Sequence, residues 1–462
     1  MLWEETDLYG KNRTLADGPI FSSLIRFAVP VLLTLFLQAL YGGVDLLVVG
    51  QFAHTADVSG VATGSMLLQT VTMVITGLTM GITILVGEKI GQRDRRAAGQ
   101  AIGSGICLFA IFALFLTAVL VAGAGPLARL LHAPEEAMGQ TMTYIRICGA
   151  GAVFIVAYNV LGAVFRGIGD SKTPLLTVCI ACVVNIVGDL VLVAGFHMGT
   201  AGAAIATVAA QAISVLVSLA VIARRPSLPF DFSRDFVRFH GRTIRMEVQL
   251  GAPVALQELL VGASFLVIQT IVNAFGVVPS AGVGVAEKVC SFIMLVPSAY
   301  MQSMSAFVAQ NMGAGQPRRA KQALGCGIAT ALAAGAVLGA FTFFRGDLLA
   351  GIFSNDAAVV AQAHSYLKAY AIDCVLTPFL FCFTGYFNGC EKTLFVMTQG
   401  IIGAFGVRIP VAYLVSRLPG VSLFEIGLAT PASSLVQICL CVLMFVWLER
   451  RRRMAQGSSL RS

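Results

Sequence analysis

The chain has 462 residues, of which 57% are hydrophobic and only 12% are charged, and its formal net charge is +8. A soluble domain usually carries about 25% charged residues, so the composition excludes an ordinary soluble protein. The positive charge does not indicate nucleic-acid binding, because the Lys and Arg residues stand between apolar runs, where they face phospholipid headgroups. The lipid bilayer is therefore the first predicted partner.

Long apolar runs, separated by Gly, Pro and charged residues, fill most of the chain. A helix that crosses a bilayer needs about 20 mostly apolar residues, and the first twenty residues show no cleavable signal-peptide pattern. The pattern predicts an all-α integral membrane protein with twelve transmembrane helices. In chain order they lie at about 21–50, 57–87, 97–124, 137–165, 174–196, 200–223, 246–275, 279–312, 319–344, 357–387, 393–417 and 423–448.

Several motifs occur twice at an almost constant offset of about 220 residues, which indicates a duplication. "FAVP" at 27–30 returns as "LGAP" at 250–253, and "GEKIGQRDRRA" at 87–97 returns as "QNMGAGQPRRA" at 310–320. Because each copy has an even number of spans, both enter the membrane from the same side. We therefore expect two parallel six-helix bundles related by a pseudo-twofold axis along the membrane normal.

This duplication predicts five segments. They are an N-terminal segment (1–20), an N-lobe with spans 1–6 (21–223), a linker (224–245), a C-lobe with spans 7–12 (246–448) and a basic tail (449–462). Most Lys and Arg residues fall on the side of the termini and the linker, which predicts that these parts are cytoplasmic in a plasma (inner) membrane protein. The turn "FRGIGDSKTPL" (165–175) lies on the same side, with Gly167 and Gly169 allowing the chain to reverse.

Two acidic residues inside predicted spans are the strongest candidates for function, because a charge within the bilayer is costly. Asp45 and Asp189 are expected at similar depth in the same bundle, with Asn185 one turn before Asp189 and Thr207 on the next span. Burial and mutual repulsion disfavour the charged form, so this cluster should hold a proton near neutral pH; equally, its oxygens can coordinate Na⁺. Pro30, in the span of Asp45, predicts a bend that protonation can bias.

The second half lacks these two acids, since Asp45 aligns with Ile268 and Asp189 falls near Arg408. It has other polar residues in its spans, and a second polar site is predicted from Glu258, Asp373, Glu287 and Arg408. The cysteines and histidines show no metal-ligand spacing. We therefore predict no metal site other than Na⁺ at the first cluster.

No ATP-binding P-loop, metalloprotease motif or catalytic triad is visible, so the sequence predicts a transporter driven by an ion gradient and not an enzyme. No cofactor is expected, and H⁺ or Na⁺ is the expected coupling ion. An integral membrane enzyme acting on lipid would need a clustered His/Asp or Ser-based site, which the sequence does not show. A channel is disfavoured because no segment repeats as a filter.

Four motifs in order resemble the multidrug and toxic compound extrusion (MATE) family: "LYGGVDLLVVG", "RGIGDSKTPL", "NIVGDLVLVAGFHMGTAGAAIAT" and "VAQNMGAGQPRRA". The resemblance implies outward antiport of cationic, amphiphilic compounds against H⁺ or Na⁺ by rocking of two six-helix lobes. It also implies that the first-lobe cation site is formed by Asp45, Asn185, Asp189 and Thr207, with Tyr41 one turn before Asp45. Pro30 matches the proline at which the first helix bends on protonation in some members.

The chain departs from the family in the second lobe. Members with an ion site there have a glutamate and an aspartate where this chain has Val261 and Thr377, while Glu258 and Asp373 lie about one turn earlier. This difference favours coupling in the first lobe. The alternative function is a flippase or exporter of a lipid-linked or polar metabolite on a related fold, and a monomer is expected because both lobes are in one chain.

Overall fold

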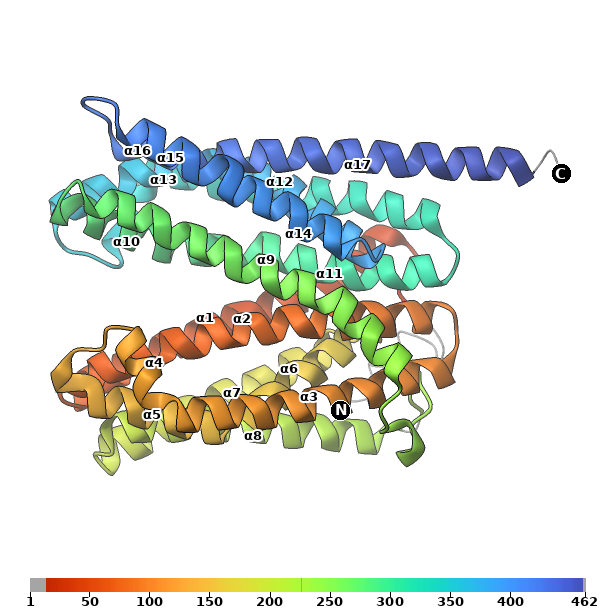
Figure 1. The fold of residues 1–462 in the computed structure, drawn as a ribbon, viewed down its shortest axis with the longest axis horizontal. Coiled ribbons are helices and arrows are strands. Elements are labelled where there is room, and N and C mark those ends of the chain that lie inside the picture. The colour runs from red at the N-terminus through yellow and green to blue at the C-terminus, as the bar shows by residue number, and fades with distance from the viewer. Residues whose placement is uncertain (1–13, 226, 460–462) are drawn as a thin grey trace. The chain divides into compact units, whose positions relative to one another are not determined.

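The computed structural model describes residues 14–225 and 227–459, and the ordered elements in these ranges are helices (Figure 1). The α-helices of the first part are α1 (Ile20–Phe52), α2 (Thr55–Gly91), α3 (Arg95–Ala122), α4 (Ala124–Leu130), α5 (Met138–Ala150), α6 (Ala152–Gly167), α7 (Lys172–Asp189) and α8 (Gly199–Arg224). Those of the second part are α9 (Gly241–Asn273), α10 (Val277–Ile293), α11 (Leu295–Gly313), α12 (Pro317–Gly351), α13 (Ala357–Gly389), α14 (Thr393–Ile401), α15 (Ile409–Ser416), α16 (Leu423–Gly427) and α17 (Ala429–Ser459).

Within the described ranges, eleven helical segments are long and apolar enough to cross a membrane, and a bent pair makes a twelfth. The pair is Glu135–Ala150 with Ala152–Gly167, which meet at an angle of 54° and correspond to the predicted fourth span. Gly151 stands at the bend, and a methyl group there would overlap the side chain of Val208 on α8. The prediction of an all-helical, multi-span membrane protein is confirmed.

The chain forms two compact units, which are described separately. Unit 1 contains the described residues up to Leu256 together with Ser305–Ala320 and Gly389–Glu391. Unit 2 contains Gln257–Met304, Lys321–Asn388 and the described residues from Lys392 onward. The predicted N-terminal segment (1–20) and basic tail (449–462) lie partly outside the described residues.

In unit 1, α7 packs against α8 and α1, while α2 packs against α5 and α6. Glycines allow these close contacts. A methyl group at Gly60 of α2 would lie 2.6 Å from Cβ of Gln140, and one at Gly64 would lie 2.5 Å from the ring of Tyr144. Gln140 and Tyr144 are both on α5. The spacing of four residues places both glycines on one face of α2.

The turn between α6 and α7 contains the predicted reversal. Gly169 has a φ of +86°, a conformation that favours glycine. Asp170 then accepts hydrogen bonds from the backbone N–H groups of Lys172 and Thr173, both at 3.0 Å, and forms an ion pair with Arg225. The side chain of Asp170 thus caps the start of α7.

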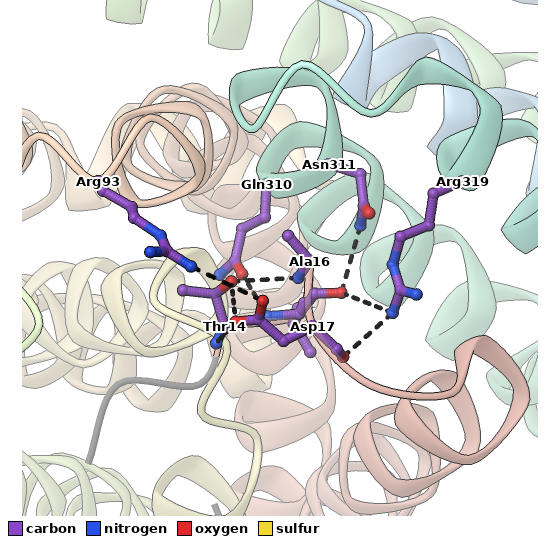
Figure 2. Close-up of polar contacts among 8 residues, drawn as sticks. Thr14, Ala16, Asp17, Arg93, Gln310, Asn311 and Arg319 are labelled. Carbon is purple, nitrogen blue, oxygen red and sulfur yellow. Dashed lines mark hydrogen bonds and ion pairs between the residues drawn. The ribbon is translucent and has the colours of Figure 1, made fainter. Parts of the chain in front are cut away.

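A short N-terminal strap, Thr14–Gly18, is bound to unit 1 by polar contacts (Figure 2). The buried Gln310 side chain accepts a hydrogen bond from the Leu15 N–H at 2.7 Å and donates one to the Gly167 carbonyl at 2.8 Å. Arg319 donates to the carbonyl oxygens of Gly18, at 2.7 Å, and Asp17, at 3.1 Å. The strap is therefore held by residues at the end of α11 and the start of α12.

The segment that joins α8 to α9 is packed against α3. Arg95 forms an ion pair with Asp231 at 3.1 Å, and Phe230 is buried. Gly99 and Gly103 of α3 leave room for this segment, since a methyl group at either position would overlap a backbone oxygen of Asp231 or Phe236.

Candidate functional site

Asp45, Asn185, Asp189 and Thr207 are brought together by three helices of unit 1. Asp45 lies on α1, Asn185 and Asp189 on α7, and Thr207 on α8, and all four side chains are buried. The Thr207 hydroxyl donates to an Asp45 carboxyl oxygen at 3.2 Å and also contacts the Ala203 carbonyl oxygen at 3.0 Å. The structure therefore brings the four residues of the predicted first cluster together inside the bundle.

Close packing of α7 and α8 sets the geometry of this cluster. A methyl group at Gly188 would lie 2.9 Å from Cβ of Ala206, so the missing side chain lets the two helices approach. Asp189 directly follows Gly188, and Thr207 directly follows Ala206. This contact therefore holds the two polar side chains near each other. The α7 helix continues directly into a π-helical segment, Leu190–Gly195, and single π-helical turns are frequent at functional sites.

The cluster has more buried polar atoms than hydrogen bonds. The Asp45 carboxyl lies within electrostatic range of Asp189 and Asn185, but only its contact with Thr207 has hydrogen-bond geometry. Both carboxyl oxygens of Asp189 and both amide atoms of Asn185 have no hydrogen-bond partner among the described residues. Because burying unpaired polar or charged groups is costly, the cluster is suited to take up a proton or a hard, oxygen-binding cation.

Two tyrosines extend the cluster. Tyr41, on α1, lies within electrostatic range of Asp45 and of Tyr158, whose hydroxyl accepts a hydrogen bond from Gln38. Tyr144, on α5, is buried and approaches both Asp45 and Thr207. Tyr144 was not predicted as a site residue. The spacing of Gly60 and Gly64, which lets α5 come close to α2, is the signal for it in the sequence.

Pro30 lies inside α1, fifteen residues before Asp45. The helix is continuous from Ile20 to Phe52, and the Thr34 hydroxyl donates to the Pro30 carbonyl at 2.7 Å. A proline removes one helical hydrogen bond. The helix is therefore weakened at this part of α1.

In unit 2, Arg408 and Asp373 are buried and within electrostatic range of each other. The Arg408 guanidinium donates to the Ser264 hydroxyl at 3.0 Å and lies 4.4 Å from the ring centre of Phe265. Arg408 is the last residue of a second π-helical segment, Ile402–Arg408. Arg408 and Asp373 are thus two of the four residues predicted for a second polar site, and they lie near each other in the folded chain.

The other two predicted residues are placed differently. Tyr366 lies within electrostatic range of both Glu287 and Arg408, so these two residues have a common neighbour. Glu258 lies on α9, and no hydrogen bond or ion pair joins it to Asp373 or Arg408 in the described part of the chain.

Comparison with known proteins gives two matches to one family model, described as MatE, at residues 30–191 and 253–414. The chain belongs to the MATE family. One match in each half of the chain agrees with the predicted duplication. Because this is a family of transporters, the prediction of a transporter and not an enzyme is confirmed.

Similar proteins cover nearly the full length of this MATE chain. The "Probable multidrug resistance protein YpnP" of Bacillus subtilis is 26% identical over 445 residues, covering 94% of this chain and 97% of the relative. The "FAD transporter" of Shewanella oneidensis is 26% identical over 443 residues, covering 92% and 94%. A solved structure described as the outward-facing conformation of a multidrug resistance MATE family transporter has a TM-score of 0.88 at 19% identity, covering 97% and 99%, so the fold is shared.

Proposed function

We propose that the protein is an antiporter that exports cationic or amphiphilic drugs, or toxic metabolites, in exchange for H⁺ or Na⁺. The observation that carries this proposal is the buried cluster of unit 1, in which the Asp45 and Asp189 carboxyl groups lie together without enough hydrogen-bond partners among the described residues. A group of this kind binds a proton or cation strongly in one conformation and releases it when water enters. The name of the YpnP relative supports the choice of drugs as substrates.

The cycle needs no direct contact between ion and substrate. Uptake of H⁺ or Na⁺ by Asp45 and Asp189 stabilises one arrangement of the N-lobe, and binding of the organic cation stabilises another. Asn185 and Thr207 supply further oxygen atoms, and Tyr41 lies beside Asp45. Pro30 is the proposed point at which α1 bends during the cycle. Alternating access of the two lobes then exchanges one ligand for the other.

The proposed topology places both termini and the 224–245 linker in the cytoplasm. The excess of Lys and Arg on that side supports this orientation. The N-lobe (21–223) and the C-lobe (246–448) would form one monomeric transporter in the plasma membrane. The organic substrate and the bilayer are its partners.

The experiment is ethidium efflux from vesicles under an imposed pH gradient and, separately, a Na⁺ gradient. Asp45→Asn and Asp189→Asn should each abolish the response of the wild type to the driving gradient. Glu136→Gln, which changes an exposed carboxylate, is the matched control and should respond normally. If neither gradient drives efflux by the wild type, or if both Asn variants respond like it, the proposal is wrong.

The second candidate is export of a polar or lipid-linked metabolite. Two observations favour it: Arg408 provides a buried positive charge in unit 2, and one relative is named as an FAD transporter. Vesicles loaded with FAD distinguish the two functions. Gradient-driven loss of FAD, with no movement of ethidium, would favour the second candidate.

A further inference from the structure

Glu247, on α9, is a buried carboxylate outside the cluster described above. It is 1% exposed, and neither of its carboxyl oxygens has a hydrogen-bond partner among the described residues. At the offset of the "FAVP" and "LGAP" motifs, its counterpart in the first half is Leu24, which is fully buried. A carboxylate therefore occupies a position that the other half of the duplication fills with an apolar side chain.

The surroundings of Glu247 are backbone and apolar atoms of two helices of unit 1. A methyl group at Gly81 of α2 would overlap the Glu247 carbonyl oxygen. A methyl group at Gly105 of α3 would lie 3.4 Å from the carboxyl oxygen Oε1 and 2.8 Å from Cδ1 of Ile82. One turn further along α9, a methyl group at Gly251 would overlap the carbonyl oxygen of Leu78. The first part of α9 thus meets α2 almost backbone to backbone, with the carboxyl enclosed at the contact.

No nearby charge compensates this carboxyl group. Within the described residues, no ion pair or hydrogen bond links it to the other titratable groups on α2, α3 and the first turns of α9. These groups are Asp57, Glu88, Lys89, Arg95, Arg96, Cys107, Arg242 and Arg245, with His240 just before α9 and Glu258 three turns further on. Lys89 pairs with Glu88, and Arg95 pairs with Asp231.

An isolated ionised carboxylate in apolar surroundings is so costly that the group takes up a proton instead. We propose that Glu247 is a proton-binding site separate from the Asp45–Asp189 cluster. It holds a proton while the first part of α9 lies against α2. When that contact opens, water solvates the carboxylate and the proton is released. Higher pH therefore favours the open contact.

The position of Glu247 within α9 makes this contact relevant to transport. The helix belongs to unit 1 up to Leu256 and to unit 2 from Gln257, and Pro253 lies three residues before that boundary. A proline weakens the helix at this point, so the first part of α9 can move separately from the rest. This role in transport rests on the proposed alternating access, whereas proton binding at the contact does not.

The test is hydrogen–deuterium exchange of the full chain in lipid nanodiscs across the neutral pH range, followed on residues 244–256. Glu247→Gln is neutral at every pH and nearly the same shape, and Glu247→Leu copies the counterpart Leu24 if the glutamine variant does not fold. Glu136→Gln serves as the control. Comparing variants at equal pH cancels the intrinsic pH dependence of exchange.

In the wild type and the control, opening should increase by up to about tenfold per pH unit between the pKa of the carboxyl group in the open contact and its pKa in the closed contact, and should level off above that range, as expected for one titrating group. In Glu247→Gln or Glu247→Leu this dependence should disappear and the segment should stay protected. If opening of the wild type does not change with pH, or if the variants keep the same slope, the proposal is overturned. The vesicle assay is independent: loss of gradient-driven efflux would refute antiport and leave the exchange result standing.

Discussion

Replacing Gln310 with alanine should release the N-terminal strap, Thr14–Gly18. Gln310 is fully buried, and its side chain joins the Leu15 N–H to the Gly167 carbonyl. Alanine leaves the Leu15 N–H of the docked strap without its partner, at a cost of about 1–3 kcal/mol. Even about 2 kcal/mol would raise the population of the undocked strap by roughly 30-fold.

Limited proteolysis measures this population, because cleavage before Asp17 by an Asp-specific protease requires the strap to leave its site. When opening is fast compared with cleavage, the rate follows the open population. Gln51→Ala, at an exposed position near the far end of α1, is the matched control and should be cleaved like the wild type. If Gln310→Ala is cleaved no faster than this control, the hydrogen bond from the Leu15 N–H to Gln310 does not hold the strap.

Three other substitutions test contacts of unit 1. Asp170→Ala removes the cap of α7 and the partner of Arg225, and should lower stability by about 1–2 kcal/mol, measured by thermal unfolding in detergent against Asp170→Asn. Gly103→Val should displace the segment that joins α8 to α9, because the valine side chain would overlap the Phe236 carbonyl. Deuterium exchange of residues 228–240 should then rise. It should not rise in the control Gly139→Val, where the space around the new side chain is open. Thr207→Val removes the hydroxyl that contacts Asp45 and should slow gradient-driven efflux by about fivefold, for a hydrogen bond of about 1 kcal/mol.

The helices and the first polar cluster could be predicted from the sequence because both depend on local composition. Apolar runs of span length predict helices, and acids such as Asp45 and Asp189 stand out within them. Tyr144 and Glu247 could not be recognised in this way. Tyrosine is common in apolar helices, and Glu247 lies near the end of a predicted span, where a carboxylate can face headgroups. Their burial depends on close helix contacts that only the folded structure shows.

The strap and the two π-helical segments were also missed, for different physical reasons. Residues 14–18 are a short mixed segment, in which Thr14 and Asp17 are polar, and they lie just before a span, so nothing in their composition indicates that Gln310 and Arg319 bind their backbone. The segments "LVLVAG" (190–195) and "IGAFGVR" (402–408) are composed like ordinary α-helix. The extra residue in a π-helical turn is set by packing against neighbouring helices, which a single sequence does not encode locally.

The two π-helical segments adjoin the place in the duplication where Asp189 falls near Arg408, and they adjoin opposite charges. The first begins directly after Asp189, whereas the second ends at Arg408. A guanidinium stays positively charged throughout the physiological pH range, so Arg408 cannot change its charge during a transport cycle. A carboxyl group can bind and release a proton. At this point of the shared framework, only the first half can therefore respond to a proton gradient, which supports coupling through Asp45 and Asp189 and assigns Arg408 a constant electrostatic role.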